Sequence, residues 1–160
     1  MKTIYESKIG SLLLESDGDA ILGISFIKEY PTENLVPLTH PAFQEIVRWL
    51  DIYFDGKCPE FTPVFKVNGL TPFRKKVVDI LLEIPYATTL TYKEIAMKIA
   101  KEMGISKMSA QAVGGAVGWN PIGILIPCHR VIGSNGSLTG YAGGLANKEA
   151  LLKLEGIKLH

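Results

Sequence analysis

The chain has 160 residues, a formal net charge of +1, 47% hydrophobic residues and 21% charged residues. These values fit a globular protein of one domain or two small ones, and no run approaches the ~18 apolar residues of a membrane-spanning helix. The first residues lack a continuous apolar core and include Glu6, which argues against a secretory signal. Because Cys58 and Cys128 are the only cysteines, we expect no disulfide framework and a cytoplasmic protein.

Charge is unevenly distributed along the chain. Residues 1–65 carry five Lys/Arg against ten Asp/Glu, whereas residues 66–131 carry nine Lys/Arg against four Asp/Glu. The basic half could contact a polyanion, or its lysines could simply line solvated helix faces. Charge alone does not separate these interpretations.

The first third of the sequence predicts a β-meander followed by one helix. Three short apolar or β-branched segments, residues 4–6, 12–15 and 21–26, are separated by glycine-containing turn signals. Apolar residues then recur at helical spacing from Phe43 to Phe54, and Gly56 is expected to end that helix. Strands together with a helix indicate a small α+β unit.

The rest of the chain is predicted to be mainly helical, with Ser or Thr at helix starts and Gly or Pro at helix ends. The second and third of the helices below are joined by a short turn and have the outline of a helix-turn-helix. The expected helices run from Thr71 to Pro85, from Thr91 to Gly104, from Ser109 to Asn120 and from Lys148 to Leu154.

The helix that begins after Ser109 has very little side-chain bulk. Its sequence, A-Q-A-V-G-G-A-V-G-W, contains three glycines, and each costs roughly 0.5–1 kcal/mol relative to alanine in a helix. One explanation is close packing against a neighbouring helix. The other is that the helix backbone enters a narrow groove, such as the minor groove of DNA.

The motif I-P-C-H-R-V, residues 126–131, places a cysteine beside a histidine. Residues 124–126 are expected to be buried and extended, so Pro127 would turn the chain and present Cys128 to a pocket. Adjacent side chains do not face each other, so a water bridge to His129 is the more plausible proton path. Glu155 is a candidate to orient the imidazole. The alternative is that Cys128 is an ordinary small buried side chain.

A glycine-rich segment, residues 131–145, follows the cysteine and is predicted to be a loop. Tyr141 is its one aromatic residue and could stack on a flat ligand, although such loops often only connect. The chain contains no phosphate-binding glycine motif and no zinc-binding spacing, so we expect no nucleotide cofactor and no metal.

Two stretches of the chain closely resemble the alkylguanine-DNA alkyltransferases, also called methylated-DNA–protein-cysteine methyltransferases. They are the run from Asn120, N-P-I-G-I-L-I-P-C-H-R-V-I-G-S-N-G-S-L-T-G-Y-A-G-G-L, and the segment L-K-L-E-G near the end. The resemblance spans residues 72–156 and is weaker before them. It implies an α+β fold with a ribonuclease-H-like α/β domain over residues 1–68. A helical, winged-helix-like domain with a helix-turn-helix would occupy residues 69–160.

The resemblance implies DNA repair by a single-turnover methyltransferase, which moves an alkyl group from 6-O-alkylguanine to Cys128, with 4-O-alkylthymine as a second candidate substrate. It gives His129 the role of the base acting through water, and Glu155 the role of orienting that histidine. Asn120 would brace the turn that holds the active site. The implied partner is double-stranded DNA containing alkylated guanine, with no cofactor, no membrane and no protein partner required.

The resemblance also implies roles in binding the substrate and the duplex. Tyr92 would help to turn out the target nucleotide, and Gln111 stands where the family commonly has an arginine that fills the gap left by the flipped base. We therefore expect weaker affinity for DNA. Ala142 stands where the family often has serine. The expected substrate-binding residues are Tyr92, Val117, Val131, Tyr141 and Ala142, and the expected DNA-binding residues are Gln111, Ala112, Gly114, Gly115 and Arg130.

Two other functions compete with this interpretation. An alkyltransferase-like protein would bind lesions without repairing them, but members of that group lack the cysteine that this chain has. A Cys-His hydrolase would form a thioester and turn over repeatedly, whereas a thioether from alkyl transfer would be permanent.

Overall fold

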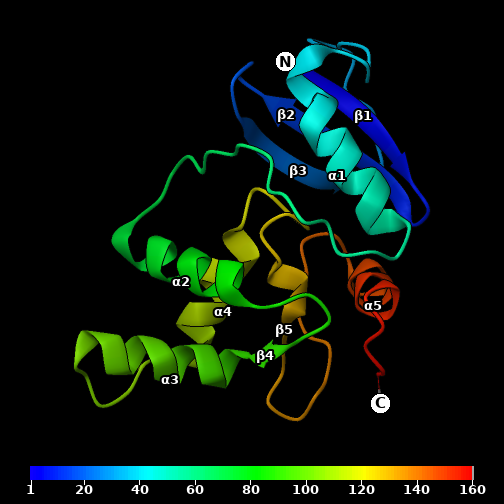
Figure 1. The fold of residues 1–160 in the computed structure, drawn as a ribbon. Helices are drawn as coiled ribbons and strands as arrows, with labels where there is room; N and C mark the ends of the chain where they lie inside the picture. Colours follow the sequence, from blue (N-terminus) through cyan, green and yellow to red (C-terminus); the bar gives the residue numbers. More distant parts are fainter. Residues whose placement is uncertain (160) are drawn as a thin grey trace. The chain divides into compact units, whose positions relative to one another are not determined.

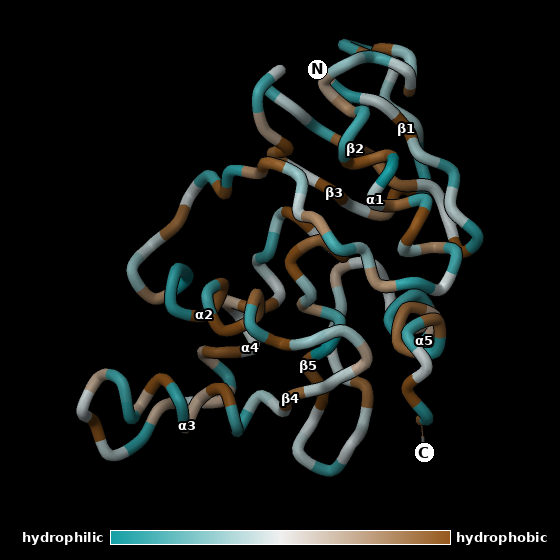
Figure 2. The backbone as a smooth tube through the Cα atoms, in the orientation of Figure 1, coloured by the Kyte–Doolittle hydropathy of each residue, from teal (hydrophilic) through white to brown (hydrophobic). Residues whose placement is uncertain are grey.

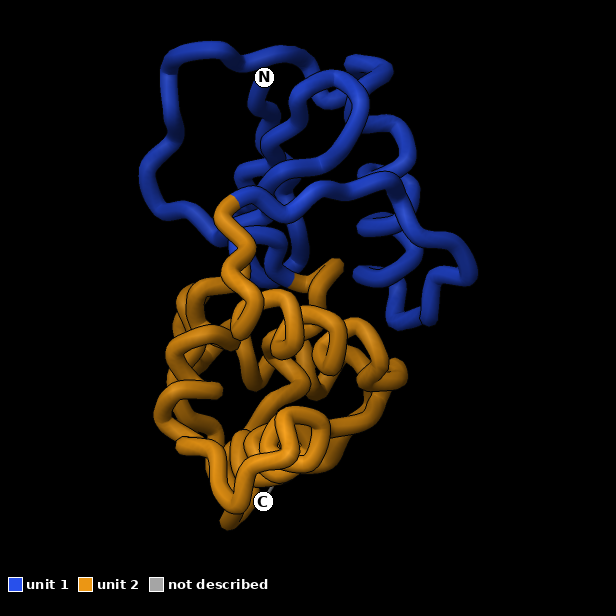
Figure 3. The backbone as a smooth tube through the Cα atoms, turned by 90° about the vertical axis from the view of Figure 1, so that its left-hand side faces the viewer, with its two compact units in different colours: residues 1–68, 121–123 blue, residues 69–120, 124–160 orange. Residues whose placement is uncertain are grey.

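The computed structural model describes residues 1–159 and consists of two compact units (Figure 3). The first unit contains residues 1–68 together with 121–123. The second contains residues 69–120 and the chain from 124 onward. No helix within residues 1–159 is both long enough and apolar enough to cross a membrane.

The first unit is a three-stranded antiparallel sheet with one covering helix (Figure 1). The strands β1 (Lys2–Ser7), β2 (Gly10–Ser16) and β3 (Ile21–Ile27) follow one another in the sheet, so the predicted meander is confirmed. A 3₁₀ turn, η1 (Pro41–Phe43), leads into helix α1 (Gln44–Phe54). Tyr5 of β1 stacks on Phe54 and donates a hydrogen bond to Asp51, which attaches the helix to the sheet.

Three residues from the middle of the second unit's sequence belong to the first unit. Ile24 of β3 donates its backbone N–H to the carbonyl of Pro121 at 3.1 Å, and Gly123 donates to the carbonyl of Ile24 at 2.9 Å. These bonds form a short parallel bridge between Ile24 and Ile122. The chain therefore leaves the second unit after Asn120 and returns to it at Ile124.

The second unit is mainly helical. In chain order it contains α2 (Pro72–Glu83), β4 (Leu90–Thr91), α3 (Tyr92–Met103), α4 (Ala110–Trp119), η2 (Cys128–Arg130), β5 (Val131–Ile132) and α5 (Leu145–Leu154). Hydrophobic and hydrophilic bands alternate along α2 and α3, as expected for helices that bury one face (Figure 2). The predicted helix-turn-helix corresponds to α3 and α4.

The predicted starts of α2, α3 and α4 are confirmed. The Thr71 side chain accepts a hydrogen bond from the N–H of Arg74, and Ser109 caps α4 in the same way. Thr91 and Glu94 form the complete reciprocal capping box. These caps satisfy backbone N–H groups that have no partner within a helix.

Two local expectations were wrong. Residues 124–126 are buried as predicted, but they form a turn rather than an extended segment, and Ile124 has a left-handed φ of 67°. Burial in the tertiary structure holds Ile124 in this left-handed conformation, which is sterically unfavourable for a β-branched residue. Helix α5 begins at Leu145, three residues before the expected start. Its N-cap, Gly144, provides no side-chain cap, so the sequence lacked the usual start signal.

Candidate active site

The candidate active site is built around one turn of 3₁₀ helix. Pro127 precedes η2, in which Cys128, His129 and Arg130 are 8%, 0% and 8% exposed. A 3₁₀ helix has about three residues per turn, so these successive side chains point in three directions. The next strand, β5, pairs in parallel with β4 and fixes the turn beside the start of α3. Cys128 and His129 therefore belong to one site without facing each other directly.

His129 is oriented by a carboxylate from the end of α5. Its Nε2 lies 2.6 Å from Oε2 of Glu155, and both side chains are fully buried. Burial lowers the pKa of His129, so the neutral imidazole donates its Nε2–H to Glu155. Burial by itself would raise the pKa of Glu155, but the hydrogen bonds from His129 and Arg130 and the positive charges that these side chains carry at acidic pH outweigh it and lower this pKa to about 2. The carboxylate is therefore ionised at neutral pH.

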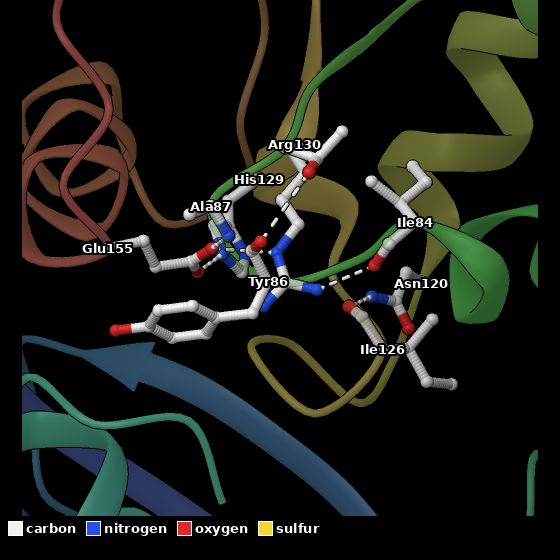
Figure 4. Close-up of polar contacts among 9 residues, drawn as sticks. Ile84, Tyr86, Ala87, Asn120, Ile126, His129, Arg130 and Glu155 are labelled. Atoms are coloured by element: carbon white, nitrogen blue, oxygen red, sulfur yellow. Dashed lines mark hydrogen bonds and ion pairs between the residues drawn. The ribbon is translucent and has the colours of Figure 1, made fainter.

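Arg130 binds the other oxygen of the same carboxylate (Figure 4). Its Nε donates to Oε1 of Glu155 at 2.8 Å, and its NH1 donates to the carbonyl of Ile84 at 2.8 Å. The backbone N–H of Ala87 also donates to Oε1, at 2.9 Å. The guanidinium of Arg130 is buried in an ion pair, so its position in this structure does not support the expected contact with DNA.

Cys128 has one hydrogen-bonding side chain, Asn120, and one positive charge, Lys148, in its environment. Asn120, at the C-cap of α4, donates from Nδ2 to the carbonyl of Ile126 at 2.9 Å and so joins the two ends of the turn before the cysteine. Burial raises the pKa of the Cys128 thiol, whereas a hydrogen bond with Asn120 and the positive charge of Lys148 act in the opposite direction. The site thus contains groups that favour the thiolate inside an apolar environment that disfavours it.

A cavity of about 600 Å³ opens between α3, α4 and the glycine-rich loop. This volume lies within the roughly 300–1,000 Å³ that is usual for small-ligand sites. Burial raises the pKa of Tyr92 and Tyr141 in its wall, and a negative charge on Cys128 raises both further. Both tyrosines are thus close enough to Cys128 to respond to its charge, but Cys128 itself is not among the residues that line the cavity. Residues that line it include Tyr92, Lys93, Gln111, Gly114, Tyr141 and Ala142.

Comparison with known families gives a match to each of two parts of the chain. Residues 72–157 match the model of the 6-O-methylguanine DNA methyltransferase DNA-binding domain, and residues 1–66 match that of its ribonuclease-like domain. The chain belongs to the 6-O-methylguanine DNA methyltransferase family. The resemblance and the two-part α+β fold inferred from the sequence are both confirmed.

Individual members of this methyltransferase family match almost the whole chain. The methylated-DNA–protein-cysteine methyltransferase of Methanosarcina acetivorans is 46% identical over 96% of both chains. That of Haemophilus influenzae is 41% identical over 97% of this chain and 86% of its own. The crystal structure of Mycobacterium tuberculosis OGT in complex with DNA has a TM-score of 0.80 and 39% identity, covering 96% of this chain and 91% of that one.

In this family member, α4 presents a thin surface to solvent. Gln111, Ala112, Gly115 and Gly118 are exposed, whereas the bulkier valines of the helix are buried. A Cβ atom at Gly115 or Gly118 would meet nothing within 4 Å, so close packing does not explain these glycines. A Cβ at Gly114 would only reach ordinary contact with the ring of Tyr92, at 3.9 Å. These glycines therefore keep the exposed surface of α4 slim.

The remaining expected residues are divided between the cavity and the core. Tyr92, Gln111, Gly114, Tyr141 and Ala142 line the cavity. Val117 and Val131 are 3% and 0% exposed and lie outside this lining, so their role as pocket walls stays a prediction. The structure therefore brings the polar and aromatic candidates together and places both valines in the interior.

Sequence reasoning missed two groups at the site. Lys148 is fully buried, and its Nζ donates to the carbonyls of Thr139 at 2.9 Å and Gly140 at 3.4 Å. Burial lowers the pKa of Lys148 to about 8. A lysine in the predicted buried stripe of a helix was the signal that could have identified it. Ala87 acts through its backbone N–H, which no sequence motif reveals.

Proposed function

We propose that this protein repairs DNA by moving an alkyl group from the 6-oxygen of guanine in a duplex to Cys128, once per molecule. The observation that carries the proposal is the buried Glu155–His129 pair next to Cys128. The cavity with two tyrosines in its wall supports it, because a purine needs a flat-sided site of this size. Membership of the methyltransferase family also supports it.

The proposed activation of Cys128 follows from the hydrogen bond of His129. Because Nε2 donates to Glu155, the other ring nitrogen, Nδ1, is the proton acceptor of the neutral imidazole. A proton from the thiol reaches Nδ1 through a bridging water. The ionised Glu155 then stabilises the imidazolium that forms, so the charge separation costs less inside the protein.

The transfer itself is a displacement at carbon. The thiolate of Cys128 attacks the alkyl carbon, a sulfur–carbon bond forms, and the bond between that carbon and the guanine oxygen breaks. The electron pair leaves with guanine, which takes up a proton. The product on sulfur is a thioether, which water does not hydrolyse, so each molecule acts once.

The proposed mode of DNA binding places α4 in the minor groove. The exposed surface of α4 is formed by Gln111, Ala112, Gly115 and Gly118, which allows the helix backbone to approach the bases closely. The alkylated base must leave the stack to reach Cys128, at a cost on the order of a few kcal/mol. Lys93 lines the cavity, is exposed, and would contact a phosphate of the bound duplex. Because such contacts are independent of sequence, affinity should fall with salt and show little sequence preference.

Mass measurement tests the proposal directly. The intact protein is incubated with a duplex containing one 6-O-methylguanine, and its mass is measured by mass spectrometry. Cys128→Ala is the matched control. We expect a permanent gain of one methyl group on Cys128, and no gain in the variant, which should still bind the duplex. A protein that binds the lesion without gaining mass would be a lesion-binding protein, and one that turns over repeatedly would be a hydrolase.

Two finer points of the proposal have their own tests. A duplex containing 4-O-methylthymine, in place of the guanine lesion, shows whether the cavity also admits a pyrimidine. Cys58 and Cys128 are both free thiols, and a nucleophilic thiol needs a reducing compartment. We therefore place the protein in the cytoplasm, which fractionation of cells would test.

A further inference from the structure

The two oxygens of the Glu155 carboxylate have different partners. Oε1 accepts hydrogen bonds from Nε of Arg130 and from the backbone N–H of Ala87, at 2.8 and 2.9 Å. Oε2 faces Nε2 of His129 at 2.6 Å. The terminal torsion of a glutamate is normally broad, so a carboxylate with a single partner can rotate. Two donors from separate segments fix the plane of this one and keep Oε2 directed at the imidazole.

The same guanidinium also holds the turn that precedes Tyr92. Its NH1 donates to the carbonyl of Ile84, the C-cap residue of α2. Three residues later, Ala87 has a φ of 61°, the left-handed conformation in which its N–H reaches Glu155. The chain then enters β4 and reaches Tyr92 at the start of α3. Arg130 thus connects the carboxylate to the segment that carries the cavity tyrosine.

Only an arginine suits this position. The guanidinium has several N–H groups in a rigid plane, so one side chain can bond Glu155 through Nε and Ile84 through NH1. Lysine would keep the charge but would offer a single nitrogen. The charged groups that act on His129 are Glu155, Arg130 and Lys148, and both cations lower its pKa. Arg130 therefore affects both the geometry and the ionisation of the pair.

We propose that Arg130 is a positioning residue for alkyl transfer, which holds the Glu155 carboxylate toward His129 and fastens the turn before Tyr92 to that carboxylate. This inference rests on the proposed transfer to Cys128. It replaces the role in DNA contact that the sequence had suggested. In this role Arg130 acts on the reaction through Glu155, to which it is bonded.

The test compares Arg130→Lys and Arg130→Met with the parent. Single-turnover transfer from a 6-O-methylguanine duplex should fall by roughly tenfold or more in both, since misaligned acid–base groups forfeit part of their usual contribution. Affinity for an unmethylated duplex should stay within about twofold, because Arg130 is not on the surface. In Arg130→Met, NMR titration should show a pKa of His129 above that of the parent. On acidification, this variant should therefore lose transfer at a higher pH than the parent does.

Arg74→Lys is the matched control, because Arg74 also donates to a backbone carbonyl in the second unit but lies away from Glu155. Its transfer rate and pH profile should equal those of the parent. If both Arg130 variants transfer in proportion to their folded fraction with an unchanged pH profile, Arg130 is only structural and the inference is overturned.

If Arg130→Met does not fold, Arg130→Lys decides the matter, since it keeps the charge and most of the volume. A parental rate and pH profile in that variant also overturns the inference. If the parent gains no methyl group on Cys128, the proposed function has failed instead. In that case the pKa of His129 in Arg130→Lys still tests the positioning role of Arg130. A pKa that differs from that of the parent supports this role, and an unchanged pKa refutes it.

Discussion

Replacing Glu155 with glutamine should destabilise the protein in a way that depends on pH. The folded environment lowers the pKa of Glu155 from 4.5 to about 2. Each pKa unit corresponds to about 1.4 kcal/mol, so the ionised carboxylate stabilises the folded protein by about 3 kcal/mol at neutral pH. Leaving one charge of a buried pair without its partner costs a similar ~3–5 kcal/mol. Since domains are stable by only about 5–15 kcal/mol, the loss should be easy to measure.

The sign of the pH effect follows from the direction of the shift. Because the pKa is lower in the folded state, the stabilisation is complete above the ordinary pKa of 4.5 and is lost as the pH falls toward 2. The parent should therefore lose this stability on acidification, whereas Glu155→Gln has none of it to lose. The difference in free energy of unfolding between the two proteins should shrink from neutral to strongly acidic pH.

Urea denaturation at several pH values measures this difference. The second unit can be followed by the fluorescence of Trp119 if both proteins carry Trp49→Phe, since the chain has only these two tryptophans. Glu149→Gln is the matched control on the same helix, because its ion pair with Lys153 is exposed and should contribute less than about 1 kcal/mol. An equal difference between parent and Glu155→Gln at neutral and acidic pH would refute the reasoning and assign the loss to packing.

Three further substitutions test other parts of the site. Lys148→Met should slow the reaction of Cys128 with iodoacetamide several-fold near neutral pH, because the charge of Lys148 lowers the pKa of that thiol. An unchanged rate would show that Lys148 does not affect the ionisation of Cys128. Ala87→Gly should raise the free energy of unfolding by about 0.5–1 kcal/mol in urea titrations, since glycine adopts a φ of 61° at no steric cost. A loss of stability would count against backbone strain at this turn. Gln111→Arg should tighten duplex binding and steepen its salt dependence by about one released counterion. Equal salt slopes for the variant and the parent in a binding titration would argue against contact of residue 111 with DNA.

The sequence predicted the elements whose signals are local. The three strands and the capped starts of α2, α3 and α4 were predicted correctly, because alternation, Ser/Thr caps and glycine stops act within a few residues. The start of α5 was missed for the same reason, since its Gly144 N-cap forms no side-chain cap. The left-handed turn at Ile124 was missed because burial in the tertiary structure holds it.

By itself, the sequence determined which family the chain belongs to and which residues are candidates for chemistry, because the P-C-H-R-V run and the L-K-L-E-G end are contiguous patterns. Only the tertiary structure decided how Arg130 is used, since Glu155 is 25 residues away along the chain and Ile84 is 46 away. It likewise decided that Lys148 is buried against Thr139 and Gly140. The physical reason is that burial and hydrogen bonding depend on which segments meet in space, and a charged side chain has no fixed role until its partners are present.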